Sequence, residues 1–339
     1  MINGGGNSTS PGDVLDITAK GATSVTYETD FTNIETLTAS GATLVGDGTD
    51  NTFTLTDLTL GTGTLDGVVN FSGISQVDGG GHASGDTLDI IALGAADITY
   101  QTDFTNIEVL TANGATLVGD ATDNTFTLTA LDTGDLDGVV TFTGIDRVDG
   151  GAEVTVTGDT LDITALGATD ITYQTDFTNI ETLTASGATL IGNALANTFT
   201  ISSLNGGDLD GVVNFSGVSD LRGAEGDDIF TLGTNGSLSG TIDGESGSNI
   251  LNARQVGTNE WTIAALANTL AYAGNSTTFA NISTLNGGAE IDTFALNTDF
   301  IGTINGAAGA DVFDIYVDQS GSLYGGLNND TFNLMVSGL

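Results

Sequence analysis

The feature that most constrains this chain is a long internal repeat. The segment that starts at Asp13, DVLDITAKGATSVTYETDFTNIETL, returns at Asp86 and again at Asp159, each time 73 residues later. A weaker fourth start, DDIFTL, follows at Asp227. Self-similarity at a fixed period is typical of repeat proteins, in which each unit buries its apolar face against the next unit. We therefore expect a stack of repeats, although the length of 339 residues alone would suggest two ordinary domains.

A finer period of 19 residues lies inside each repeat. Apolar residues recur at this spacing, and the period survives in the divergent C-terminal part of the chain as Phe294, Phe313 and Phe332. The marker residues of the three repeats are Leu15, Ile34, Phe53 and Ile74, then Leu88, Ile107, Phe126 and Ile145, then Leu161, Ile180, Phe199 and Val218. Across the whole chain this gives about 17 intervals of roughly 19 residues.

The local pattern within each period is typical of short strands. Segments such as TFTLT, DITY and TLDIT alternate in polarity, are rich in Thr, Val, Ile and Phe, and are bounded by Gly, Asn and Asp. Two or three strands with glycine corners would make one coil of about 19 residues, stacked about 4.8 Å from the next coil. The sequence therefore predicts an all-β fold, a parallel β-solenoid (right-handed β-helix or β-roll) of about 17 coils.

A polar column accompanies the apolar markers two residues earlier. Because the parity is the same, we expect these side chains to turn inward at a corner and to bond neighbouring backbone. The column comprises Asp13, Thr32, Asn51, Ser72, Asp86, Thr105, Asn124, Thr143, Asp159, Thr178, Asn197, Ser216, Asp228, Asn249, Asp292, Asp311 and Asp330.

Charge excludes several classes of partner. The chain has 44 acidic residues against 4 Lys and Arg, a formal net charge of −40. It cannot neutralise the phosphates of a nucleic acid, and it offers no basic face to an acidic membrane. It contains no Cys and one His, His82, which excludes disulfides, thiolate sites and multi-histidine metal sites. The N-terminus lacks the pattern of a signal peptide, and no segment approaches the length of an apolar membrane span.

Four segments resemble the calcium-binding nonapeptide of RTX β-rolls, G-G-x-G-x-D-x-U-x. They are GAEGDDIFT, GGAEIDTFA, GAAGADVFD and GGLNNDTFN, which start at Gly223, Gly287, Gly306 and Gly325. The resemblance implies Ca²⁺ ligands at Gly223, Gly226, Asp228, Asp292, Gly306, Gly309, Asp311, Gly325, Gly326 and Asp330. Several glycines are replaced, and in the 73-residue repeats the acid is often Asn, so a hydrogen-bonded Asx ladder without calcium is the alternative.

A wider resemblance is to giant repetitive bacterial surface and secreted proteins, such as adhesins and haemagglutinin-like proteins. It is carried by G-x-D-T-F followed by F-x-x-I-E-x-L, seen here as FTNIETL at Phe31 and Phe177 and as FTNIEVL at Phe104. The resemblance implies an extracellular, non-catalytic rod that serves as a rigid stalk or a fibre-forming subunit. Its partners would be other copies of itself, head to tail, or surface glycans.

Two other functions are compatible with a β-solenoid, an enzyme and a carbohydrate-binding module. Parallel β-helices also include polysaccharide-degrading enzymes, but the acidic motifs such as GDLDG recur in the repeats, whereas a catalytic site should be singular. A carbohydrate-binding module is the other alternative. Trp261 and Tyr272 lie in a non-repetitive insertion near 259–279, where they could stack on a sugar or form a longer coil or a short covering helix.

We expect the domains to be a flexible segment at 1–12, three solenoid repeats at 13–85, 86–158 and 159–226, and a divergent continuation at 227–339. Carboxylates on stacked coils lie within a Debye length of about 8 Å, so their repulsion should lower stability at low salt. The sequence therefore predicts a fold that salt or Ca²⁺ stabilises.

Overall fold

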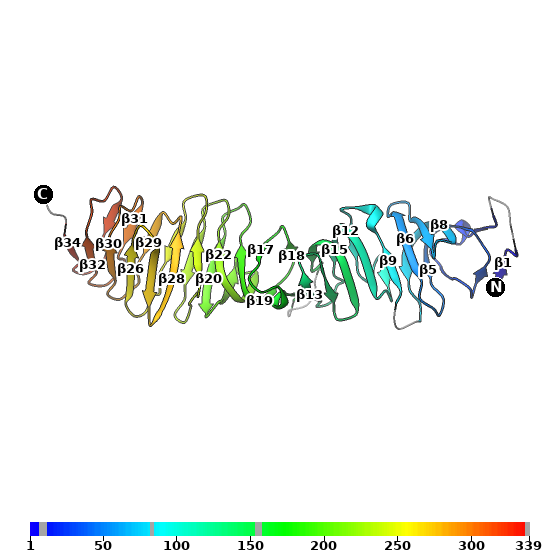
Figure 1. Cartoon of the computed structure of the whole chain (residues 1–339), viewed down its shortest axis with the longest axis horizontal. Coiled ribbons are helices and arrows are strands. Elements are labelled where there is room, and N and C mark those ends of the chain that lie inside the picture. Colours follow the sequence, from blue (N-terminus) through cyan, green and yellow to red (C-terminus); the bar gives the residue numbers. More distant parts are fainter. Residues whose placement is uncertain (7–11, 82–84, 153–157, 336–339) are drawn as a thin grey trace. The chain divides into compact units, whose positions relative to one another are not determined.

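The computed structural model confirms a mostly parallel β-solenoid (Figure 1). It describes residues 1–6, 12–81, 85–152 and 158–335; His82 lies outside these ranges. The chain divides into two compact units, one of residues 1–161 with 177–180, the other of 162–176 with 181–339. The division therefore falls inside the third repeat.

In the part of each repeat that the structure describes there are seven strands and one 3-10 helix. The first has β2 (Val14–Asp16), η1 (Thr18–Lys20), β3 (Ser24–Thr26), β4 (Phe31–Thr32), β5 (Thr36–Val45), β6 (Thr52–Asp57), β7 (Thr62–Leu65) and β8 (Val69–Asp78). The second has β9 (Thr87–Asp89), η2 (Ile91–Leu93), β10 (Asp97–Thr99), β11 (Phe104–Thr105), β12 (Val109–Val118), β13 (Thr125–Ala130), β14 (Thr133–Leu136) and β15 (Val140–Asp149). The third has β16 (Thr160–Asp162), η3 (Thr164–Leu166), β17 (Asp170–Thr172), β18 (Phe177–Thr178), β19 (Thr182–Ile191), β20 (Thr198–Ser203), β21 (Gly206–Leu209) and β22 (Val213–Arg222).

Further strands precede and follow the repeats. Strand β1 (Ile2–Asn3) lies in the segment that we expected to be flexible. The C-terminal continuation has β23 (Ile229–Leu232), β24 (Thr241–Asp243), β25 (Ile250–Asn252), β26 (Asn259–Ile263), β27 (Asn268–Tyr272), β28 (Asn275–Ala280), β29 (Thr284–Asn286), β30 (Thr293–Leu296), β31 (Thr303–Asn305), β32 (Val312–Ile315), β33 (Ser322–Tyr324) and β34 (Thr331–Leu334).

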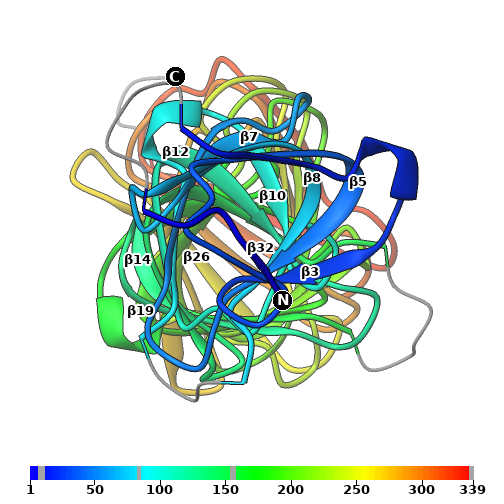
Figure 2. The same cartoon turned by 90° about the vertical axis from the view of Figure 1, so that its right-hand side faces the viewer.

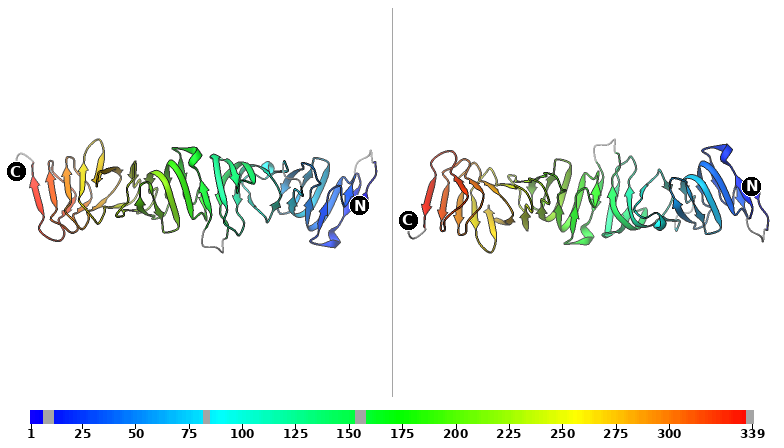
Figure 3. Two further views of the ribbon diagram at one scale, coloured as in Figure 1. Left: turned by 90° about the horizontal axis from the view of Figure 1, so that it is seen from below. Right: turned by 90° about the horizontal axis from the view of Figure 1, so that it is seen from above.

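The last coils follow the 19-residue period directly. Leu285, Ile304 and Leu323 pair in register along β29, β31 and β33, and Phe294, Phe313 and Phe332 do so along β30, β32 and β34. Figure 3 shows these orange to red strands as successive parallel ribbons. Here one coil takes 19 residues, as the sequence predicted.

In the repeats an inserted antiparallel meander increases the number of residues between positions that pair. Strands β6, β7 and β8 form two hairpins, while β8 pairs in parallel with β5 and β6 pairs in parallel with β9 of the next repeat. The order across the sheet is therefore β5-β8-β7-β6-β9, and Phe53 lies beside Leu88, 35 residues later. The tight Asp66-Gly67 turn, with φ of 51° and 65°, suits a hairpin between β7 and β8.

The marker residues are interior, but only some of them, such as Phe53 and Leu88, lie side by side as predicted. Ile34, Phe53, Leu88, Ile107 and Phe126 are all buried. Leu15, however, pairs with Leu37 rather than with Ile34. The single marker column was therefore wrong in the repeats, because the meander and the corners bring residues from different positions of the period side by side. Figure 2, which looks onto the N-terminal coil, shows strands turning around this common interior.

The polar column also divides. Its Asn and Asp members from Asn51 to Asp311 are buried, whereas Thr143 and Ser216 are exposed. Along β15 the buried residues Phe142, Ile145 and Val148 are three apart, because a register shift opposite Ala115 breaks the alternation of the strand. The parity argument therefore holds at the glycine corners and fails inside the long strands.

Candidate functional site

The most regular polar feature is a ladder of Asn and Asp side chains at the corner before each of a series of strands. An inward Oδ1 atom accepts a hydrogen bond from the backbone N–H of the ladder residue on the preceding coil. The donor and acceptor residues, with their distances, are Asn51 and Asp86 (2.7 Å), Asn124 and Asp159 (2.6 Å), Asn197 and Asp228 (2.8 Å), Asp228 and Asn249 (2.9 Å), Asn259 and Asp292 (2.9 Å), Asp292 and Asp311 (2.8 Å), and Asp311 and Asp330 (3.0 Å). This is the Asx ladder that the sequence offered as the alternative to calcium.

The RTX-like glycines make room for the ladder. A Cβ atom on Gly306 would lie 2.3 Å from Asp311 Oδ2, and one on Gly223 would lie 2.0 Å from Asp228 Oδ2. Gly325 has the same relation to Asp330, whereas Gly226, Gly309 and Gly326 have positive φ angles. The matched residues thus combine glycine and aspartate in one corner, as the resemblance implied, but the carboxylates point inward to backbone amides.

No group of three or more His, Cys, Asp or Glu residues that could hold a metal ion is found within the described ranges. The carboxylates of Asp311 and Asp330 each accept a backbone hydrogen bond through one oxygen and pack against glycine through the other. In this arrangement the carboxylates serve as acceptors of an Asx ladder. Calcium binding stays a prediction.

Burial changes the acidity of the ladder. Desolvation by burial is the main cause that raises the pKa of Asp228 to about 6. The hydrogen bond from the Asn197 N–H lowers this pKa, and the nearby negative charges of Asp210, Asp227 and Glu245 raise it. Desolvation also raises the pKa of Asp292 and of Asp311, and the neighbouring carboxylates of Asp292 and Asp330 raise that of Asp311 further. The buried Oδ2 atoms of Asp228 and Asp311 have no hydrogen-bond partner, whereas that of Asp292 accepts from the Gly288 N–H. Protonation of these residues therefore becomes easier in the folded chain.

The Asn members have a different second contact. The Nδ2 atoms of Asn51, Asn124 and Asn197 donate to Oδ2 of Asp66 (3.1 Å), Asp137 (3.1 Å) and Asp210 (2.9 Å). These aspartates stand in the Asp-Gly turns, and their Oδ1 atoms accept the N–H of the residue that follows each asparagine. The recurring TLDG and GDLDG acids are therefore structural.

A second recurring contact, the strand-end clamp, fixes the other side of the corner. Oδ1 of Asp78 accepts from the Gly80 N–H and from Asn106 Nδ2, both at 2.8 Å. Asp149 makes the same contacts with Gly151 and Asn179. Asn106 and Asn179 have positive φ angles of 51°, a conformation that Asn tolerates well. The Asn of the FTNIE motif thus serves in two ways, because its backbone adopts a positive φ angle and its side-chain amide donates to the clamp aspartate.

The Glu of the same motif binds the ladder. Glu35 Oε2 accepts the N–H of Asp13 at 2.7 Å, and Glu108 Oε2 accepts that of Asp86 at 3.0 Å. The F-x-x-I-E-x-L motif therefore connects neighbouring coils through the hydrogen bond that its Glu accepts.

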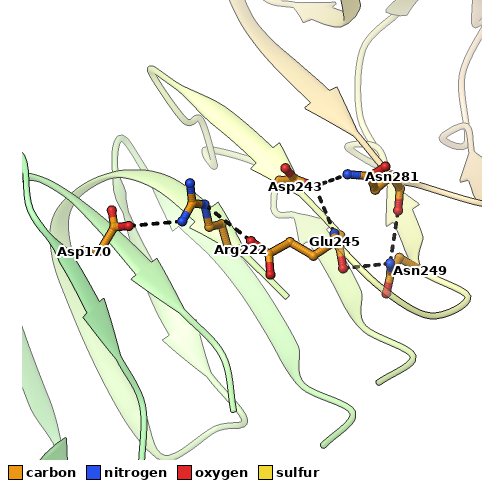
Figure 4. A network of polar contacts seen from close by, with 7 residues as sticks. Asp170, Arg222, Asp243, Glu245, Asn249 and Asn281 are labelled. Atoms are coloured by element: carbon orange, nitrogen blue, oxygen red, sulfur yellow. Dashed lines mark hydrogen bonds and ion pairs between the residues drawn. The ribbon is translucent and has the colours of Figure 1, made fainter. Parts of the chain in front are cut away.

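Arg222 links three coils at the surface of the second unit (Figure 4). Its Nη1 lies 3.0 Å from Asp170 Oδ2, and its Nε lies 3.6 Å from Glu245 Oε1. Asp243, beside it, forms a strand-end clamp with the Glu245 N–H and Asn281 Nδ2. The partners are solvent-exposed, so we interpret Arg222 as local charge neutralisation.

The insertion near 259–279 is an antiparallel meander like those of the three repeats, formed by β26, β27 and β28, and not a covering helix. Trp261 is 1% exposed and stacks on Phe294 with Phe279 against its edge, so it presents no ring face to a ligand. Tyr272 is also buried, with Arg254 over its ring, yet it lines a surface cavity of about 310 Å³ with Glu260 and Asn275. Of the two predicted sugar-binding residues, only Tyr272 borders a surface cavity.

Within the described residues, the structure contains no helix with the length and apolarity needed to span a bilayer. Comparison with protein-family models, with curated proteins and with solved structures found no match.

Proposed function

We propose that this protein is a non-catalytic structural β-solenoid, a rigid stalk or spacer of a bacterial surface or extracellular matrix. The observation that carries the proposal is that the conspicuous polar motifs serve the backbone of neighbouring coils. Asn124, Asp137 and Glu108 each bond a backbone or side-chain group of the coil stack, and the contacts of Asn124 and Asp137 recur in all three repeats. Residues used in this way supply length and stiffness rather than a singular reactive site.

The charge supports an extracellular setting. A net charge of −40 keeps a repetitive protein soluble and discourages side-by-side association. We include bound Ca²⁺ in this proposal only as a stabiliser of surface carboxylates. If it acts so, millimolar CaCl₂ raises the thermal midpoint more than NaCl of equal ionic strength does. Equal midpoints would leave only ionic screening.

Removal of one whole repeat tests the proposal. A variant without residues 86–158 joins Gly85 to Asp159, which restores the order of the repeat motifs. We expect an unchanged far-ultraviolet spectrum per residue and a radius of gyration that falls with the number of repeats. A variant without residues 86–131 is the out-of-phase control, because it joins Gly85 to Asp132 and so puts the hairpin strand β14 where β9 stood. Unfolding of the in-phase variant would contradict a modular spacer.

The cavity beside Tyr272 favours one alternative, a carbohydrate-binding module. Tyr272, Glu260 and Asn275 place an aromatic edge, a carboxylate and an amide around one opening. A glycan array probed with the whole chain and with Asn275→Ala tests it. Selective binding that this substitution abolishes would favour the binding module over the spacer.

A further inference from the structure

We propose that a second copy of this chain docks head to tail, with the coil of β33 and β34 stacked on the coil of β1 and β2 in one defined register. The inference deepens the proposed structural role by naming its partner. It rests on the likeness of the two end coils to corners that stack on one another inside the chain, and on exposed apolar side chains at both end coils.

The N-terminal residues repeat an internal corner. Asn3 Oδ1 accepts from the Gly5 N–H at 2.7 Å and from Asn33 Nδ2 at 2.9 Å, the contacts of the strand-end clamp. Strand β1 pairs with Phe31–Thr32 as Val77–Asp78 pairs with Phe104–Thr105. Asp13 and β2 then follow, as Asp86 and β9 follow Asp78. Residues 1–3 and 13–16 thus correspond to residues 76–78 and 86–89.

The internal corner is covered on its outer side. Leu44 of β5 pairs with Val77, Phe53 of β6 pairs with Leu88, and the Asn51 N–H donates to Asp86 Oδ1. Val77 and Leu88 are consequently buried. At the N-terminal corner, Ile2 is 53% exposed and Leu15 is half-buried, because no strand of the described chain covers them.

The C-terminal coil has the sequence of such a cover. Asp330 to Leu334 read DTFNL, against NTFTL for Asn51 to Leu55. Phe332 is 42% exposed and Leu334 58%, whereas Phe53 is fully buried in the equivalent place. Strand β34 pairs with β32 on one side, and β33 pairs with β31 on one side, so each offers an open edge to a further strand.

The internal stacking fixes the register of the contact. Phe332 would lie over Leu15 as Phe53 lies over Leu88, and Leu323 would lie over Ile2 as Leu44 lies over Val77. The Asp330 N–H would donate to the Asp13 carboxylate and continue the ladder. Because the two surfaces differ, the contact is heterologous and leaves each end of a dimer free for another copy. Both copies are acidic, so salt should promote the association.

Sedimentation velocity of the whole chain tests the docking. We expect the mass to rise with protein concentration and with NaCl, and Phe332→Asp to abolish the rise because it places a charge at the centre of the contact. Leu266→Asp is the matched control, since Leu266 is fully exposed away from either end coil. A monomer under all conditions, or assembly that Phe332→Asp does not reduce, would overturn the proposal.

Disulfide trapping tests the register, because the chain contains no Cys of its own. Thr331 and Val14 correspond to the internal pair Thr52 and Thr87, and paired strands bring such residues within disulfide range. The Thr331→Cys variant and the Val14→Cys variant are mixed and oxidised, and the yield of disulfide-linked mixed dimers is measured. We expect this yield to be well above that of a control mixture of the Leu266→Cys and Val14→Cys variants. Equal yields would overturn the register. Neither failure would contradict the spacer, which needs no self-association and is tested by the repeat deletion.

Discussion

The repeats and the C-terminal coils build the same interior in two ways. In the repeats the ladder alternates Asn with Asp, and each Asn amide is bound by an aspartate of an antiparallel turn. In the last coils three aspartates follow one another, and beside them Trp261, Phe294, Phe313 and Phe332 stack 4.6 to 5.7 Å apart. The comparison indicates that inserted meanders supply polar partners for the ladder, whereas simple 19-residue coils depend on aromatic stacking and accept raised pKa values.

The largest expected effect comes from breaking the aromatic stack. Phe313→Ala removes a fully buried ring that stacks on both neighbours, and should lower the free energy of unfolding by about 3–5 kcal/mol. Phe126→Ala in a repeat is the matched variant, equally buried but cross-paired with Leu136. Urea unfolding followed by far-ultraviolet circular dichroism reports on both regions, and the free energy of unfolding should fall more for Phe313→Ala. Equal falls would show that stacking adds nothing particular to these coils.

The next effect is on the alternating ladder. Asn124→Asp would replace the amide that donates to Asp137 by a buried carboxylate beside that aspartate, at a cost of about 3 kcal/mol at neutral pH. The thermal midpoint measures the loss. Adding Asp137→Asn to the same chain should restore much of the stability, because it returns one amide to the pair. A double variant no better than the single one would contradict this pairing.

The pH dependence of the C-terminal unit should be intermediate in size. Because the pKa of Asp228 is raised to about 6 in the folded chain, the native state binds more protons than the unfolded state between pH 6 and the ordinary aspartate pKa of 3.8. The free energy of unfolding should therefore increase as pH falls from 7.5 to 5. The increase is at most about 1.4 kcal/mol for each unit by which the pKa of Asp228 differs between the folded and the unfolded chain. The urea midpoint followed by Trp261 fluorescence measures it.

Asp228→Asn is the control for that pH effect. Asn keeps the Oδ1 acceptor for the Asn197 N–H, and Asn249 already shows that an amide fits this corner by donating to Gly244 O. The variant should be more stable than the natural chain at pH 7.5 and less sensitive to pH. An unchanged pH profile would assign the effect to other carboxylates.

The smallest effect is expected at Arg222. Both of its ion pairs are solvent-exposed, so Arg222→Ala should cost less than about 1 kcal/mol, and less still at high salt. Thermal midpoints at low and high NaCl concentration check this. A large loss that salt does not diminish would mean that Arg222 holds the coils together.

The sequence predicted the class of fold and the corner ladder because both depend on local, periodic signals. Asp86, Asp159 and Asp228 were identified from their place before a strand, and all three turn inward. The meanders were not predicted, because β6, β7 and β8 differ from coil strands only in partners that lie up to 35 residues away. The roles of Asp66 and Asp137 could have been found from the Asp-Gly turns, since this dipeptide between apolar strands is a strong hairpin signal.

The direction of the ladder bonds makes the two ends of a stack of coils chemically different. In each of the seven ladder bonds the N–H donor comes earlier in the sequence than the side chain that accepts it, as Asn51 does relative to Asp86 and Asp292 relative to Asp311. A coil therefore directs backbone donors toward the coil that follows it and side-chain acceptors toward the coil that precedes it. Two unlike ends of such a stack can pair these groups, whereas two like ends would leave them unpaired.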